Sequence, residues 1–142
     1  MPVAQEPAKP LDPATTEEPV QLQMSVPGVL DSLSYRRVER RPPGPGEVEI
    51  RVRATGLNFR DVLNALGMYP GDAGLLGGEC AGEIVALGEG VSRFQPGQEV
   101  MGIAAGSFSN YVTTAADLLV AKPEALSFAE ACTIPSAFMT AY

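Results

Sequence analysis

Apolar and polar residues alternate with a period of two along much of the chain beyond its proline-rich start. The clearest alternation begins at Val48, where Val48, Ile50 and Val52 are interleaved with Glu49 and Arg51. Alternation of this kind is typical of a strand with one buried face. Similar runs predict further strands at 20–24, 33–36, 83–87, 98–103, 108–114 and 118–121. Because Gly/Pro turns separate the runs, we expect a mainly β domain with short helices, folded as a compact, partly open barrel.

Short helices are predicted where this alternation stops. Asn58 suits an N-cap, and Asp61 in the first turn suits the positive end of the helix dipole. Gly67 fits the left-handed position that ends such a helix. A capping box at 127–130 predicts a second short helix. After Pro135 the pattern predicts a third helical stretch over 136–142.

The first residues of the chain have a different composition from the rest. Residues 1–19 contain five prolines, separated mostly by Ala, Thr and Glu. Proline removes a backbone donor and restricts φ, so such a segment favours an extended, hydrated coil. We therefore expect a Pro-rich linker at 1–19 and one folded domain at 20–142, although an ordinary frayed terminus would have a similar composition.

Composition and charge narrow the classes of partner. The net charge of −7 makes nucleic acid and anionic lipid unfavourable partners. No apolar run reaches the ~20 residues that a membrane span needs, and the start lacks the features of a signal peptide. We therefore expect a soluble, cytoplasmic protein with no membrane partner. The basic run at 36–41 is either a solvated strand end or a contact for an acidic partner such as an acyl carrier protein.

Several kinds of chemistry are excluded by the residues present. The chain has no histidine, which removes Ser-His-Asp and Cys-His catalysis and the commonest metal ligand. Cys80 and Cys132 are the only cysteines, too few for a four-ligand zinc site, and we expect them to be buried thiols, not a disulfide. Neither a P-loop nor a Gly-x-Gly-x-x-Gly after a buried strand is present. The sequence therefore offers no recognisable cradle for a dinucleotide.

Five short stretches carry a more specific signal through their order and spacing. They lie at 27–33, 58–71, 77–82, 96–102 and 134–142. Together they resemble the medium-chain dehydrogenase/reductase superfamily and, within it, the enoylreductase domains of modular polyketide synthases. The resemblance covers about residues 22–142. It implies a GroES-like barrel that forms one wall of an active site, with the nucleotide-binding Rossmann domain expected only beyond this chain.

The resemblance also implies a reaction and a set of residues. Such enzymes use NADPH to reduce a 2-enoyl thioester on an acyl carrier protein, with hydride going to the β-carbon and a proton to the α-carbon. Tyr69 matches the family's Tyr-Pro position and would donate or steer that proton. Asn58 and Thr140 would contact the cofactor. Zinc-dependent members have a cysteine where this chain has Asn58 and a histidine where it has Gly78, so the resemblance implies the zinc-free branch and no metal.

Alternatives remain open for the function and for each residue. The chain could be half of a quinone oxidoreductase, or a non-catalytic docking or structural module. Tyr69 could simply pack on the turn proline, Asn58 could serve as a helix cap, and Thr140 could be a polar residue of a helix. Arg60 and Glu79 could form an ion pair beneath the site. With its partner domain missing, we expect the chain alone to be inactive.

Overall fold

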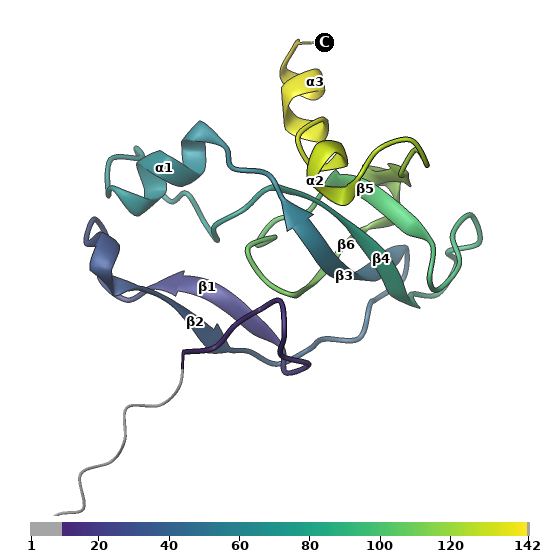
Figure 1. Ribbon diagram of the computed structural model, residues 1–142, viewed down its shortest axis with the longest axis horizontal. Coiled ribbons are helices and arrows are strands. Elements are labelled where there is room, and N and C mark those ends of the chain that lie inside the picture. Colours follow the sequence, from purple (N-terminus) through teal and green to yellow (C-terminus); the bar gives the residue numbers. More distant parts are fainter. Residues whose placement is uncertain (1–9, 142) are drawn as a thin grey trace, which may run out of the picture.

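The computed structural model describes residues 10–141, which form two antiparallel sheets (Figure 1). The smaller sheet pairs β1 (Val20–Met24) with β2 (Leu33–Arg37), and the single-turn helix η1 (Leu30–Ser32) precedes β2. The larger sheet has the order β6-β3-β4-β5-β7. Its strands are β3 (Glu47–Thr55), β4 (Glu79–Leu87), β5 (Glu99–Ile103), β6 (Tyr111–Ala115) and β7 (Leu119–Ala121), with η2 (Ala116–Leu118) between the last two. Because β6 and β7 are its two edges, this sheet stays open, and the predicted mainly β, partly open fold is confirmed.

The main core lies on one face of the larger sheet. It contains Val48, Ile50, Cys80, Ile84, Val100 and Leu119. The predicted alternation of β3 is therefore confirmed for its apolar side. The opposite face of β3 is not left to solvent, however, because Glu49 and Arg51 are only 4% and 7% exposed. Glu49 accepts hydrogen bonds from Arg40, and the Arg51 guanidinium lies 4.9 Å from the centre of the Tyr111 ring.

The strand β4 begins four residues earlier than the alternation predicts. Residues 79–82 are all buried, so they show no alternation of apolar and polar side chains. Gly82 is required at this point, since a Cβ there would lie 2.1 Å from the backbone oxygen of Arg51 on β3. A stretch in which apolar and polar side chains do not alternate cannot be recognised by a period of two.

The segment before β1 packs against the domain where the structure describes it. The side chain of Asn110, 2% exposed, accepts a hydrogen bond from Val20 N–H and donates to the carbonyls of Thr16 and Glu18. Arg51 also donates to the Thr16 carbonyl. The backbone of this part of the segment is therefore bonded to the domain at Thr16 and Glu18, although no residue of 10–19 is buried. Residues 1–9 of the predicted linker lie outside the described range.

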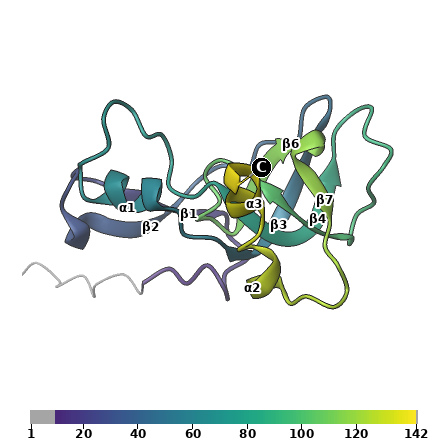
Figure 2. The ribbon, with the colours of Figure 1, turned by 90° about the horizontal axis from the view of Figure 1, so that it is seen from above.

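The described residues contain three short helices where the sequence predicts helical stretches: α1 (Phe59–Ala65), α2 (Phe128–Ala131) and α3 (Pro135–Ala141). The capping box predicted at Ser127 is present for α2, and the predicted N-cap Asn58 forms a capping box with Asp61 at the start of α1. Gly67 follows α1 with a φ of 68°, as predicted for a left-handed C-terminal glycine. Figure 2 shows α1 beside the small sheet at one end of the molecule and the larger sheet at the other, with α3 near the junction. Within residues 10–141, no helix has the length and apolar character required to span a membrane.

Candidate active site

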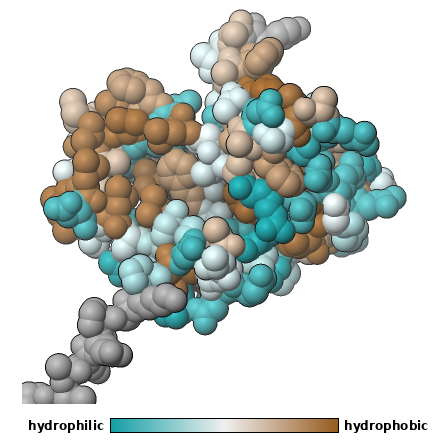
Figure 3. All heavy atoms as spheres, viewed as in Figure 1, coloured by the Kyte–Doolittle hydropathy of each residue, from teal (hydrophilic) through white to brown (hydrophobic). Residues whose placement is uncertain are grey.

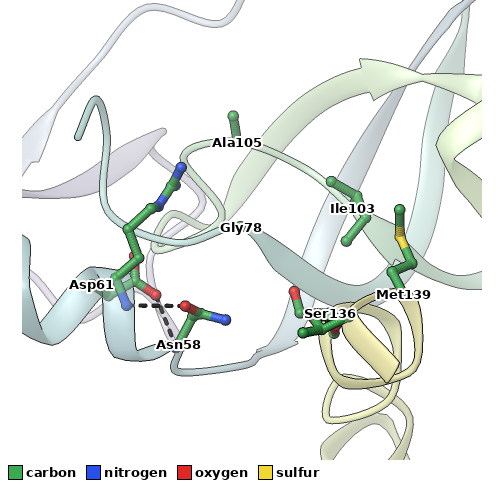
Figure 4. A pocket seen from close by; sticks show the side chains of 9 residues that line it. Asn58, Asp61, Gly78, Ile103, Ala105, Ser136 and Met139 are labelled. Carbon is green, nitrogen blue, oxygen red and sulfur yellow. Dashed lines mark hydrogen bonds between the residues drawn. The ribbon is translucent and has the colours of Figure 1, made fainter. Parts of the chain in front are cut away.

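A cavity of about 360 Å³ lies where the start of α1 faces α3 (Figure 4). Its lining includes Asn58, Arg60 and Asp61 at α1, Gly78 before β4, and Ser136 and Thr140 on α3. A neighbouring cavity of about 450 Å³ shares Asn58, Ser136 and Thr140. The structure therefore brings together the two residues predicted to contact a cofactor, although they lie far apart in the sequence.

Asn58 caps α1 and keeps hydrogen-bonding capacity for a ligand. Its Oδ1 accepts a bond from the Arg60 N–H at 2.9 Å, and its own N–H donates to Asp61 Oδ2 at 3.0 Å. Figure 4 shows the amide nitrogen of Asn58 pointing across the cavity toward α3, where Ser136 and Met139 lie. Among the bonds of the described residues none uses this nitrogen, so two N–H donors face the cavity.

Thr140 lines this cavity, whereas Tyr69 does not. The Thr140 hydroxyl lines it but donates to the Ser136 carbonyl one turn earlier, at 2.8 Å. It can therefore act toward a ligand only as an acceptor. Tyr69 is partly buried on the loop after α1 and lines neither of the two cavities. The roles assigned to Asn58, Thr140 and Tyr69 stay predictions.

Asp61 is a buried carboxylate that holds the wall of the cavity together. It is 2% exposed, and its two oxygens accept from different backbone amides: Asn58 N–H at 3.0 Å and Gly77 N–H at 2.9 Å. The first bond confirms that Asp61 stabilises the start of α1. The second ties α1 to the segment leading into β4, and nothing in the sequence indicated it.

Glu79 performs a similar task in the lining of the neighbouring cavity. It is 5% exposed, and its Oε2 accepts a hydrogen bond from the Ser136 N–H at 2.8 Å. Gly56 makes room for it, because a Cβ at that position would lie 2.3 Å from Glu79 Oε1. The Arg60–Glu79 ion pair that the sequence left open does not occur among the ion pairs of residues 10–141. Glu79 instead positions α3.

The basic run at 36–41 is largely neutralised. Arg37 pairs with Glu18, Arg40 with Glu49 and Arg41 with Glu47. Only Arg36 of its four arginines has no ion pair in the described part of the chain. The pairing favours the interpretation of this run as a solvated strand end over that of a contact for an acidic partner.

Burial controls the chemistry of the two thiols. Cys80 and Cys132 are both buried and free. Desolvation, with a smaller effect of the nearby Cys132 and Glu79, raises the pKa of the Cys80 thiol from its ordinary value of 9.0 to about 12. Desolvation also raises the pKa of Cys132. Since the thiolate is the nucleophile, neither residue is suited to act as one at neutral pH.

These pKa shifts predict a loss of stability at alkaline pH. Between pH 9 and about 12 the Cys80 thiol is ionised in the unfolded chain but not in the folded one. The unfolded state then binds fewer protons, so the free energy of unfolding falls as pH rises, by about 1.4 kcal/mol per pH unit at most. Denaturant titrations at pH 8, 9 and 10 measure how the free energy of unfolding depends on pH. Cys80→Ala should make this dependence weaker. An unchanged slope in that variant would contradict the assignment.

A separate apolar cavity of about 290 Å³ lies between the small sheet and α1. Its lining includes Leu22, Leu33, Val62, Leu66, Leu76 and Phe108. Figure 3 shows apolar side chains gathered on this side of the molecule, around α1. Asp61 borders both this cavity and the polar one, so an apolar compartment adjoins the polar site.

The family model of the alcohol dehydrogenase GroES-like domain matches residues 44–124, which is more than half of the chain. The chain belongs to this family. The match covers the five strands of the larger sheet, β3 to β7. Asn58, Gly78 and Glu79 thus lie inside the GroES-like region, whereas α3 with Thr140 follows it.

Relatives of this GroES-like domain include large polyketide synthases. It is 44% identical over 126 residues to a phenolphthiocerol/phthiocerol polyketide synthase polypeptide of Mycobacterium tuberculosis, covering 87% of this chain and 6% of that protein. It is 42% identical to the erythronolide synthase EryA2 of Saccharopolyspora erythraea, covering 94% of this chain and 4% of that protein. The chain thus spans a small fraction of these curated relatives.

Solved structures agree with this relationship. The crystal structure of CurK enoyl reductase superposes with a TM-score of 0.82 at 44% identity, over 88% of this chain and 41% of that one. A quinone oxidoreductase of Pseudomonas syringae superposes with a TM-score of 0.76 at 32% identity, over 86% of this chain and 39% of that one. The resemblance to polyketide synthase enoylreductases and quinone oxidoreductases, drawn from the five stretches, is confirmed.

Proposed function

We propose that this chain is the substrate-side part of an NADPH-dependent enoylreductase. Its substrate would be a 2-enoyl thioester on an acyl carrier protein, reduced during polyketide chain elongation beside the other synthase domains in the cytoplasm. The main support is the cavity that joins Asn58 to Thr140, in a chain 44% identical to part of CurK enoyl reductase. The adjoining apolar cavity gives further support, because an acyl chain is apolar.

The residues of the cavity suit a nicotinamide. When bound, NADPH supplies the hydride that adds to the β-carbon. The free N–H donors of Asn58 would bind the carboxamide oxygen of the nicotinamide, and the Thr140 hydroxyl would accept from its NH₂ group. Glu79 and Asp61 would hold α3 and α1 at a constant separation through their bonds to backbone amides. Positioning of this kind accelerates a reaction between two bound partners.

Tyr69 is proposed to deliver the proton to the α-carbon, because it stands at the position of the family's Tyr-Pro motif and a phenol O–H can act as a proton donor. We also propose that the reaction needs no metal. Asn58 and Gly78 replace the cysteine and histidine of the zinc-dependent members, and the amide of Asn58 is a poor zinc ligand. In the part of the chain that the structure describes, no three His, Cys, Asp or Glu side chains are grouped to hold a metal.

Half of a quinone oxidoreductase is the second candidate, favoured by the likeness to the Pseudomonas syringae enzyme. The two candidates differ in substrate. We expect the full-length polypeptide that carries this chain to oxidise NADPH with a crotonyl thioester much faster than with 1,4-benzoquinone. Absorbance at the NADPH band measures both rates. Faster turnover of the quinone would favour the second candidate instead.

The polypeptide of residues 1–142 by itself should bind NADPH weakly. The sequence contains no glycine-rich strand–turn–helix to hold the pyrophosphate, which is the main anchor of a dinucleotide. Fluorescence titration of NADPH with this polypeptide measures the affinity. Micromolar binding would show that the cofactor is held mainly by residues of this chain, contrary to the proposal.

A further inference from the structure

Arg60 is a cation of the cavity whose guanidinium forms no ion pair with any of the described residues. It is the one basic side chain in the cavity lining within the described range. The backbone N–H of Arg60 donates a hydrogen bond to the side-chain oxygen of Asn58. The guanidinium of Arg60 takes part in no hydrogen bond or ion pair of residues 10–141. By contrast, Arg40 and Arg53 both pair with glutamates. A guanidinium without a partner in a cavity is suited to bind an anion or a developing negative charge.

Neither acidic residue near the site, Asp61 or Glu79, forms an ion pair with Arg60 within the described residues. Both carboxylate oxygens of Asp61 accept from backbone amides, those of Asn58 and Gly77. Glu79 accepts from the Ser136 N–H on α3. Asp61 through both oxygens and Glu79 through Oε2 thus bind backbone amides and not the guanidinium. The N–H donors of the Arg60 guanidinium remain available to a bound molecule.

Gly78 leaves the space in front of Arg60 open. A Cβ built on Gly78 would lie 4.0 Å from the Arg60 Nη2 atom, which is ordinary van der Waals contact. Any longer side chain at that position would extend into the cavity that both residues line. With glycine there, a substrate oxygen can approach the guanidinium directly.

We propose that Arg60 is a catalytic residue that stabilises the thioester oxygen while it carries negative charge. This inference rests on the proposed function. When hydride from NADPH forms the new C–H bond at the β-carbon, the electrons of the α,β double bond shift to the bond between the α-carbon and the carbonyl carbon. The carbonyl π electrons move onto oxygen, and NADPH becomes NADP⁺. The guanidinium N–H groups donate to this enolate oxygen until a proton reaches the α-carbon and the carbonyl is restored.

The position of Arg60 favours the enolate over a phosphate of the cofactor. Arg60 and Asn58 both belong to the start of α1 and line the same cavity. If Asn58 holds the nicotinamide carboxamide, Arg60 lies close to the ring that donates the hydride. The pyrophosphate is separated from that ring by a ribose. Donors directed at a developing oxyanion are typically worth a factor of about 100 to 1,000 in kcat.

The test compares Arg60→Gln and Arg60→Lys with the wild-type full-length protein, using a crotonyl thioester. Arg60→Gln should lower kcat about 100-fold while the Kd for NADPH stays unchanged. With NADPH deuterated at the transferred position, its kinetic isotope effect should increase, because hydride transfer becomes more rate-limiting. Arg60→Lys should keep part of the activity. The control Arg53→Gln removes the same charge from an exposed ion pair with Glu83 and should behave as wild type.

Three results would overturn the assignment. A weaker affinity for NADPH with kcat unchanged would make Arg60 a phosphate ligand of the cofactor. Equal activity of Arg60→Gln and Arg53→Gln would leave it with no catalytic role. A low kcat with an unchanged isotope effect and a lowered melting temperature would mark Arg60 as structural. Failure of the wild-type protein to reduce any enoyl thioester would instead refute the proposed function and, with it, this assignment.

Discussion

Asp61→Ala is expected to lower the free energy of unfolding by about 3 kcal/mol and to disorganise the polar cavity. The substitution removes both acceptors of a carboxylate that is 2% exposed. The amides of Asn58 and Gly77 would lose their partner, and each bond of this kind to a charged group is worth about 1.5 kcal/mol or more. Urea denaturation measures the change in stability. Hydrogen exchange at Asn58 and Gly77 should accelerate in parallel.

Asp72→Ala is the matched control for this substitution. Asp72 also accepts from a backbone amide, that of Gly74, but in an exposed loop where water can replace it. Asp72→Ala should lower the free energy of unfolding by well under 1 kcal/mol. Asp61→Asn keeps one acceptor and should fall between the two, so the comparison remains possible if Asp61→Ala does not fold. Equal stability of Asp61→Ala and Asp72→Ala would show that the buried bonds are not important.

Asn110→Ala should lower the free energy of unfolding by a similar amount, about 3 kcal/mol. One buried amide holds three backbone groups: it accepts from Val20 N–H at 2.9 Å and donates to the carbonyls of Thr16 and Glu18 at 3.2 and 2.8 Å. Alanine would leave all three without this partner, the Val20 amide in a buried setting and the two carbonyls in a partly buried one. Thermal and urea denaturation measure the loss.

Two comparisons test whether the loss of stability in Asn110→Ala comes from its three buried or partly buried bonds and not from replacing any asparagine by alanine. Asn64 donates a single bond to the Gly74 carbonyl in an exposed setting, so Asn64→Ala should cost well under 1 kcal/mol. In a chain that starts at Pro19, the two donor bonds of Asn110 are already absent. In that shortened chain, Asn110→Ala should lower the free energy of unfolding clearly less than in the complete chain. An equal cost in both backgrounds would mean that the segment before β1 does not use Asn110.

Features with short-range causes could be predicted from the sequence. The capping boxes at Asn58 and Ser127 join groups within four residues of one another, so they depend little on the rest of the fold. The left-handed Gly67 is equally local. The core strand β3 was predictable because Val48 and Ile50 alternate with polar residues, although these polar residues are buried as well. At the start of β4 the sequence has no such alternation, so the boundary was misplaced.

The polar contacts that shape the candidate site could not be predicted in this way. Glu79 bonds Ser136 on another element, and Asp61 bonds Gly77 across a loop. Nothing near Glu79 in the sequence distinguishes this bond from an ion pair with Arg60, which was the sequence-based hypothesis. Similarly, the proline-rich composition before β1 does not reveal that Thr16 and Glu18 bind Asn110.

The sequence by itself determined the kind of fold, the caps of α1 and α2, the family resemblance and the exclusion of histidine-dependent chemistry. These follow from residue types and from interactions between close neighbours in the chain. The tertiary structure decided which carboxylates hold backbone amides and that Asn58 and Thr140 share one cavity. It also decided that, among residues 10–141, no acidic side chain forms an ion pair with Arg60. The physical reason is that a buried polar group bonds whichever partner folding brings within reach, and that partner can stand anywhere in the chain.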